Sequence, residues 1–216
     1  MDFIDNSINQ YSEAHSTPES EILKNLNRET QANVLLPRML SGHLQGRVLS
    51  MISRMIRPDS ILEIGTYTGY SALCLAEGLS ETGIIHTIDI NDELTPLVKK
   101  YVKLSNIEAR FNILTGNALD IIPKLDGPFD LVFIDADKIN YSNYFDLVIN
   151  KVRKGGFLIA DNVLWSGKIM MPTEKMDKDT LALHYFNEKI TNDKRLEKVL
   201  LPIRDGLLVM QVVNSK

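Results

Sequence analysis

At 216 residues, the chain is long enough for one domain with a sizeable hydrophobic core and rather short for two. Hydrophobic residues account for 44% of the sequence and charged residues for 24%, a balance that argues against the disordered and fibrous classes. The formal net charge of −4 provides no overall attraction to nucleic acid or to an anionic membrane, although it leaves room for a local basic patch.

Targeting signals and cysteine content predict a cytoplasmic location. The first residues lack a basic stretch followed by an apolar run, and no apolar run in the sequence reaches transmembrane length. The single cysteine, Cys74, has no partner for an internal disulfide, and the apolar residues around it predict a buried thiol. No repeat, low-complexity tract or linker marks a boundary, so a single domain over residues 1–216 is expected.

Helical periodicity dominates the N-terminal part of the sequence. Over about the first 55 residues, apolar residues recur at the spacing of amphipathic helices. A helix start is predicted at the Thr-Pro-Glu segment 17–19, and Pro58 ends the periodic pattern. We therefore expect a helical part at 1–57 and an α/β core at 58–216.

From residue 60 onward, short apolar runs alternate with amphipathic stretches. This alternation is typical of βαβ crossovers and a parallel sheet. Five such runs are predicted strands: 60–64, 84–89, 110–115, 129–136 and 155–161. Two later runs, 198–203 and 206–213, are separated only by Arg204-Asp205. Because so short a link cannot cross over the sheet, they are predicted to form an antiparallel hairpin at one edge.

The first two predicted strands end in residues suited to a nucleoside-containing ligand. Gly65 and Gly69 allow a tight turn and close approach of a ligand before a helix N-terminus. The middle glycine of the GxGxxG dinucleotide fingerprint is missing, which disfavours a nicotinamide cofactor. Asp89, at the tip of the second predicted strand, is placed either to accept hydrogen bonds from ribose hydroxyls or to cap the next helix. The small residues around Ala118 leave space for an adenine edge.

Acidic residues also follow the fourth and fifth predicted strands. Asp135, Asp137 and Lys138 lie at the end of the fourth, and Asp161 and Asn162 end the fifth. Neighbouring strand residues point to opposite faces, so Asp161 and Asn162 serve one site only if the backbone turns there. Two carboxylates and an amide oxygen form an all-oxygen set suited to Mg²⁺, Ca²⁺ or Mn²⁺. The alternative is that these acids cap helices and turns.

Several segments taken together resemble a known family. These segments are EIGTYTGYS, IDIN, FIDADKINY, ADNVLW and LPIRDG. They resemble the cation-dependent O-methyltransferases typified by caffeoyl-coenzyme A and catechol O-methyltransferases, and the similarity runs from about Met39 to the C-terminus. The resemblance implies a Rossmann-like class I methyltransferase: an α/β fold with a seven-stranded, mostly parallel sheet, a C-terminal antiparallel hairpin, helices on both faces and a helical N-terminal extension. It also implies a homodimer.

The resemblance assigns roles to individual residues. Asp135, Asp161 and Asn162 become the ligands of a divalent cation, with Mg²⁺ favoured over Ca²⁺ and Mn²⁺. Asp89 is assigned to the ribose of S-adenosylmethionine (SAM) and Ala118 to its adenine. The full set assigned to SAM is Met39, Ser41, Glu63, Gly65, Tyr67, Ser71, Asp89, Ala118, Asp135 and Asp137.

The implied reaction is methyl transfer from SAM to a hydroxyl of a small vicinal dihydroxy aromatic compound, such as a catechol or a caffeoyl or coenzyme A ester. A bound cation lowers the pKa of the reacting hydroxyl and fixes its oxygen for a direct displacement. Asp135 and Lys138 are the predicted catalytic residues, with Lys138 a base or an electrostatic partner of the phenolate. Trp165 is a candidate wall for the substrate ring, although a tryptophan after a strand is more often a core residue.

Three alternatives remain open. The first is methylation of 5-hydroxyuridine in transfer RNA by the same chemistry, for which the lysines at 99, 100 and 103 argue mildly and the acidic net charge argues mildly against. The second is a cofactor-binding protein without catalysis, which an intact cation set disfavours. The third is an NAD-dependent oxidoreductase, which the glycine spacing disfavours.

Overall fold

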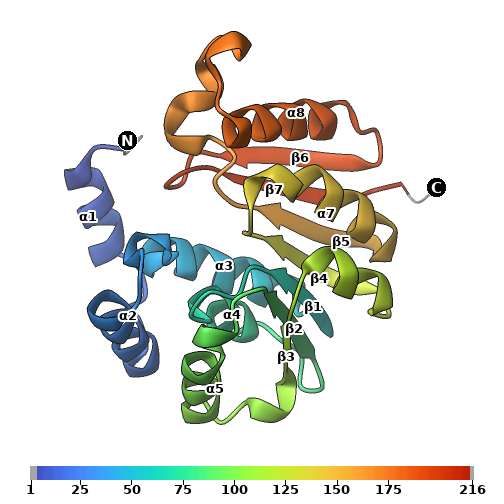
Figure 1. The fold of residues 1–216 in the computed structure, drawn as a ribbon. Coiled ribbons are helices and arrows are strands. Elements are labelled where there is room, and N and C mark those ends of the chain that lie inside the picture. The colour runs from blue at the N-terminus through green and yellow to red at the C-terminus, as the bar shows by residue number, and fades with distance from the viewer. Residues whose placement is uncertain (1–3, 215–216) are drawn as a thin grey trace. The chain divides into compact units, whose positions relative to one another are not determined.

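The computed structural model describes residues 4–214 (Figure 1). None of the helices described between these two residues has both the length and the apolarity to span a membrane. The α-helices are α1 Asn6–Ala14, α2 Glu21–Asn33, α3 Gly42–Ile56, α4 Tyr70–Ala76, α5 Thr95–Leu104, α6 Ala118–Ile121, α7 Tyr141–Val148 and α8 Lys178–Asn192. The strands are β1 Ser60–Ile64, β2 Ile84–Asp89, β3 Phe111–Thr115, β4 Phe129–Ile134, β5 Val152–Ala160, β6 Leu196–Leu201 and β7 Leu207–Val212.

The seven strands follow the sheet order β3-β2-β1-β4-β5-β7-β6. β1 pairs in parallel with β2, β2 with β3, and β4 with β5. β7 pairs antiparallel with both β5 and β6, so the last two strands form the predicted hairpin. The prediction of a mostly parallel seven-stranded sheet that ends in an antiparallel hairpin is therefore confirmed.

Residues Asp5–Asn117 form one compact unit. It contains the three parallel strands β1, β2 and β3 and the five helices α1 to α5. Helix α4 is buried along its whole length, and Cys74 on it is a free, fully buried thiol, as its apolar surroundings predict. The predicted helix start at 17–19 is wrong. Helix α2 begins at Glu21, because the side chain of Ser20 accepts a hydrogen bond from the backbone of Leu23 and caps the helix.

The second compact unit begins at Ala118. β4 and β5 are its parallel pair, and their last residues, Ile134 and Ala160, are partners in the register. Helices α7 and α8 lie side by side (Figure 1), and Phe186 of α8 meets the ring of Tyr141 edge to face at 5.4 Å. The expectation of a single domain over 1–216 stays a prediction.

Candidate active site

The turn from β1 to α4 has an unusual backbone. Gly65 and Gly69 have φ angles of +103° and +86°, and between them Tyr67 also takes a positive φ, of +48°. A Cβ added at Gly69 would lie 3.1 Å from a methyl group of Val98, so this glycine is needed both for its φ and for its closeness to α5. The turn thereby exposes backbone groups just before a helix N-terminus.

A fully buried carboxylate, that of Glu63, is linked to this turn by hydrogen bonds. Glu63, at 0% exposure on β1, accepts a hydrogen bond from the hydroxyl of Ser71 on α4 at 2.6 Å and another from the hydroxyl of Thr87 on β2. Thr87 in turn shares a hydrogen bond with Thr66 in the turn. Glu63 and Ser71, both predicted to contact SAM, are therefore bonded to each other and tie β1, β2 and α4 together.

Asp89 ends β2 and faces the same turn. Its carboxylate accepts hydrogen bonds from the backbone N–H of Tyr67 at 2.7 Å and of Asn91 at 2.9 Å. Tyr67 and Asp89 line a hollow of only about 10 Å³, roughly the space of one water molecule. The predicted cofactor residues Gly65, Tyr67 and Asp89 are thus brought together around one turn.

The segment that follows α2 is attached to this turn through Tyr67. The hydroxyl of Tyr67 donates toward the carbonyl oxygens of Leu35 at 3.1 Å and Leu36 at 3.3 Å, and burial raises the pKa of this hydroxyl. Met39, a predicted cofactor residue on this segment, is 54% exposed, and the nearby Ser41 is buried. The segment therefore presents apolar side chains to solvent while its backbone is fixed to the turn.

His43 lies shortly after this segment, on α3. Its Nε2 is 2.7 Å from the carbonyl oxygen of Thr17. This contact links α3 to the connection between α1 and α2, and it gives His43 a place in the packing of the N-terminal helices.

The ends of β4 and β5 bring Asp135, Asp161 and Asn162 together. The backbone N–H of Asp161 donates to the carbonyl oxygen of Ile134 at 3.0 Å, which places Asp161 beside Asp135 at the two strand ends. β5 ends at Ala160, and Asn162 has a φ of +58°, a left-handed conformation that asparagine tolerates. The strand therefore ends before Asp161 and the backbone turns at Asn162, as a site shared by these two side chains requires.

These three side chains fit a hard divalent cation by their chemistry. Within residues 4–214, no three His, Cys, Asp or Glu side chains are grouped so as to hold a metal ion by themselves. The set at β4 and β5 instead combines two carboxylates with the amide oxygen of Asn162, which makes no hydrogen bond to the described residues. Oxygen ligands of this kind suit Mg²⁺, Ca²⁺ or Mn²⁺.

Lys138 lies directly against this set and is only 9% exposed. Its ammonium donates to Asp135 Oδ1 at 3.1 Å and to the hydroxyl oxygen of Tyr141 at 2.7 Å. It also lies 4.8 Å from the centre of the Tyr141 ring and 5.8 Å from that of Trp165. Burial, followed by the charge of Asp135, raises the pKa of Tyr141 far above its ordinary value, so its hydroxyl stays protonated and donates. Sequence reasoning missed Tyr141.

Two other predicted residues of this unit have different surroundings. Asp137 is exposed, and its carboxylate accepts hydrogen bonds from Asn140 at 2.5 Å and from the hydroxyl of Tyr144. These bonds link Asp137 to two side chains at and near the start of α7, and among the described residues its carboxylate accepts no capping hydrogen bond from a backbone N–H. Ala118 is buried at the first residue of α6.

Trp165 lies on a loop that the C-terminal hairpin holds in place. The backbone N–H groups of Val163 and Leu164 donate to the carbonyl oxygens of Gly206 and Asp205, at 3.2 Å and 2.9 Å. The Asp205 carboxylate accepts from the backbone N–H of Ser166, and burial raises the pKa of Asp205. Val163 and Leu164 thus anchor the loop through their backbone N–H groups.

Two polar atoms near this loop are buried without a partner among residues 4–214. One is the indole Nε1 of Trp165 and the other is the amide Oδ1 of Asn187, whose nitrogen donates to the carbonyl of Val163 at 2.9 Å. The surroundings of Trp165 therefore contain one donor and one acceptor that are unpaired within the described chain.

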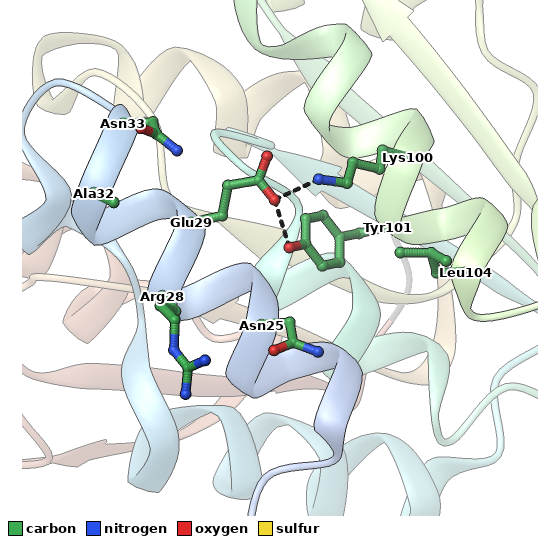
Figure 2. Close-up of a pocket in the computed structure, with 8 residues that line it drawn as sticks. All are labelled: Asn25, Arg28, Glu29, Ala32, Asn33, Lys100, Tyr101 and Leu104. Carbon is green, nitrogen blue, oxygen red and sulfur yellow. Dashed lines mark hydrogen bonds and ion pairs between the residues drawn. The ribbon is translucent and has the colours of Figure 1, made fainter.

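A hollow of about 480 Å³ lies between α2 and α5, and Figure 2 shows the residues that line it. Its centre is the Glu29 carboxylate, which accepts hydrogen bonds from the ammonium of Lys100 and the hydroxyl of Tyr101, both at 2.6 Å. None of the residues predicted to bind SAM, cation or substrate lines it. Lys100 belongs to the lysine cluster considered for RNA binding, and its charge is already paired with Glu29.

Comparison with known proteins decides the family. A family model described as O-methyltransferase matches residues 13–213. The chain belongs to this O-methyltransferase family. Caffeoyl-CoA O-methyltransferase of Medicago sativa is 32% identical over 207 residues, which cover 91% of this chain and 83% of the relative. Probable caffeoyl-CoA O-methyltransferase 2 of Dictyostelium discoideum is 30% identical over 214 residues, covering 97% and 93%.

Solved structures of other O-methyltransferases have the same fold. The O-methyltransferase from Bacillus cereus in complex with SAH superposes with a TM-score of 0.87 at 28% identity, covering 95% of this chain and 97% of that chain. TomG from Streptomyces achromogenes, in complex with SAM, superposes with a TM-score of 0.88 at 27% identity, covering 97% of each chain. The chain is therefore a SAM-dependent O-methyltransferase, similar to the caffeoyl-CoA O-methyltransferases.

Proposed function

We propose that this O-methyltransferase uses a divalent cation, Mg²⁺ in the first place, to methylate a hydroxyl of a catechol-like small molecule. The single observation that carries the proposal is the arrangement at the ends of β4 and β5. There, Asp135, Asp161 and Asn162 follow the two adjacent strand ends, and the buried ammonium of Lys138 donates to Asp135. A cation held by this set would still have room for water and for two vicinal acceptor oxygens.

The proposed cation ligands and Lys138 would have two separate effects on the acceptor hydroxyl. Asp135, Asp161 and Asn162 would hold the cation, which would supply a Lewis acid that lowers the pKa of the acceptor hydroxyl. Lys138 then stabilises the negative charge that develops on the acceptor oxygen, because its ammonium is desolvated and fixed by Asp135. Trp165, whose ring faces the Lys138 ammonium, forms a wall for the aromatic acceptor.

The SAM side of the reaction belongs to the β1 turn and the residues around it. Asp89 accepts hydrogen bonds from the ribose hydroxyls, because its carboxylate lies at the tip of β2 and retains acceptor capacity beyond the two backbone N–H groups. Gly65 and Tyr67 present backbone to the methionine end, and the buried Glu63 and Ser71 hold that turn in shape. The remaining contacts are assigned to Met39, Ser41, Ala118, Asp135 and Asp137.

Three further statements belong to the same proposal. The whole chain, 1–216, acts as one methyltransferase domain, it works in the cytoplasm, and it forms a homodimer. Light scattering on the purified protein at micromolar concentration tests the last of these, and a mass near 24.4 kDa, that of one chain, would contradict it.

The decisive experiment measures methyl transfer from labelled SAM to three acceptors: caffeic acid, caffeoyl-coenzyme A and bulk transfer RNA. Each is assayed with Mg²⁺ and with excess EDTA. We expect label in one or both of the small diols with Mg²⁺, and a loss of transfer in EDTA that added Mg²⁺ reverses. Label only in RNA would overturn the acceptor class, and unchanged transfer in EDTA would overturn the use of a cation.

A further inference from the structure

Tyr141 connects Lys138 to the backbone of a proposed cation ligand. Its side chain is 0% exposed, and its hydroxyl oxygen lies 2.7 Å from the Lys138 ammonium and 2.9 Å from the carbonyl oxygen of Asp161. Because an ammonium has only protons to give, Lys138 donates to Tyr141, and the tyrosine proton then points to Asp161. A weaker alternative acceptor, the carbonyl of Ile134, lies at 3.4 Å.

We propose that Tyr141 is a positioning residue for methyl transfer: it fixes the Lys138 ammonium relative to the strand ends that carry Asp135 and Asp161. The inference rests on the proposed function, in which Lys138 stabilises the acceptor oxygen. Its basis is the unbroken series of contacts from Asp135 to Lys138, to Tyr141 and to the Asp161 carbonyl.

The donor count of Lys138 explains why this matters for the reaction. An ammonium has three N–H groups, and among residues 4–214 Lys138 uses two of them, on Asp135 and Tyr141. These two bonds fix the rotation of the ammonium, so the direction of its third N–H is set. We assign this third N–H to the acceptor oxygen. Without the tyrosine hydroxyl, the lysine keeps its charge and Asp135 but loses the bond that fixes its direction.

The ring of Tyr141 has a separate, structural role. It packs edge to face against Phe186 at 5.4 Å and lies under the Lys138 ammonium at 4.8 Å. A Tyr141→Phe substitution keeps both contacts and removes only the hydroxyl. This variant therefore separates positioning of Lys138 from packing of the core.

The experiment is a double-mutant cycle on methyl transfer with Tyr141→Phe, Lys138→Met and the double variant. We expect Tyr141→Phe to lower kcat by about 10- to 100-fold, the range for losing a hydrogen bond to a charged group. The Kd for SAM is expected to stay within about 2-fold, since a positioning role concerns the acceptor side. In the Lys138→Met background, removing the Tyr141 hydroxyl should lower kcat no further.

Tyr101→Phe is the matched control. Tyr101 is also a buried tyrosine whose hydroxyl bonds a charged partner, Glu29, but it lines the α2–α5 hollow and carries no proposed catalytic or binding role. We expect it to lower the midpoint of thermal unfolding about as much as Tyr141→Phe does, with kcat unchanged. A fall in kcat equal to that of Tyr141→Phe would overturn the inference, because loss of stability would then explain both.

The variants distinguish a wrong role for Tyr141 from a wrong role for Lys138. If Lys138→Met lowers kcat and Tyr141→Phe does not, the inference is wrong and the proposed function stands. If Tyr141→Phe lowers kcat by the same factor in the Lys138→Met background, Tyr141 acts independently of Lys138, which also overturns the inference. If Lys138→Met leaves kcat unchanged, the role of Lys138 in the proposed function is wrong, and the inference falls with it.

Discussion

The carboxylates at the turn after β1 and the polar groups at the ends of β4 and β5 differ in how they are bonded within the protein. In Asp5–Asn117, the carboxylates assigned to SAM binding are bonded within the protein: Glu63 to two hydroxyls and Asp89 to two backbone N–H groups. In the unit that begins at Ala118, the Asn162 amide and the Trp165 indole have no hydrogen-bond partner among the described residues, and Lys138 keeps one N–H to give. The first arrangement fixes the turn, for which we propose SAM binding largely through backbone groups. The second leaves polar atoms for a ligand to complete.

The largest effect expected from this contrast is the loss of turnover in Asp161→Ala. Removing a carboxylate ligand removes Lewis-acid stabilisation worth several kcal/mol, so kcat should fall by about 10³-fold or more. The Kd for SAM should stay within about 2-fold, since the turn that carries Glu63 and Asp89 is untouched. Steady-state kinetics and calorimetry with SAM measure both, and Asp126→Ala, an exposed aspartate, is the control. Full activity in Asp161→Ala would break the comparison.

A smaller effect, on SAM binding and not on the use of Mg²⁺, is expected for Asp89→Ala. This change removes a charged acceptor for ribose hydroxyls and leaves two N–H groups of the turn without their bonds. The Kd for SAM should rise by about 10- to 100-fold, while the Mg²⁺ concentration that gives half-maximal activity stays the same. Titration of SAM by calorimetry and of Mg²⁺ by activity checks each part. A shift in Mg²⁺ dependence without weaker SAM binding would contradict it.

Alanine substitutions at two glycines test how rigid the SAM turn is. Gly69 and Gly155 both have positive φ, at +86° and +78°, so alanine is strained at either position. At Gly69 the new methyl would also meet Val98 at 3.1 Å, whereas at Gly155 it would meet only the mobile end of Arg153 at 3.3 Å. Gly155→Ala should cost about 1 kcal/mol of unfolding free energy, and Gly69→Ala about 1 kcal/mol more. Urea unfolding measures both losses. Equal losses would show that the turn around Gly69 shifts enough to accommodate the added methyl group.

The smallest effect concerns the pH dependence of stability through Cys74. Burial raises the pKa of this thiol from 9.0 to about 12, so between these pH values the unfolded chain has lost a proton that the folded chain keeps. Stability therefore falls as the pH rises through this window. Cys74→Ala should show a shallower fall in the urea midpoint between pH 8 and pH 10 than the parent protein. Identical slopes would mean that the thiol is accessible in the folded state.

Much of this architecture is predictable from the sequence because it depends on periodicity. The alternation after residue 60 predicts the succession of strands along the chain, and the short Arg204-Asp205 link predicts the hairpin. Polar residues at strand ends indicate where Asp89, Asp135 and Asp161 lie, since parallel strands bring their carboxyl ends together.

Other features depend on contacts that sequence spacing does not reveal. The Thr-Pro-Glu segment 17–19 carries the residues of a helix start, but in the folded chain Ser20 caps the helix instead. The hydroxyl of Tyr141 contacts Lys138, three residues away, but also the carbonyl of Asp161 just after the end of β5, and no local pattern encodes the second contact. The SAM, cation and substrate roles of individual residues stay predictions.

The clasp between the C-terminal hairpin and the Trp165 loop has a consequence for building chimeras of related enzymes. A Cβ at Gly206 would lie 2.6 Å from the side chain of Leu164, and the Asp205 carboxylate accepts a hydrogen bond from the backbone N–H of Ser166. The segments 163–167 and 204–206 therefore form one structural unit, although α8 and β6 lie between them in the chain. A swap of either segment alone would join mismatched halves, whereas exchanging both together transplants the loop intact.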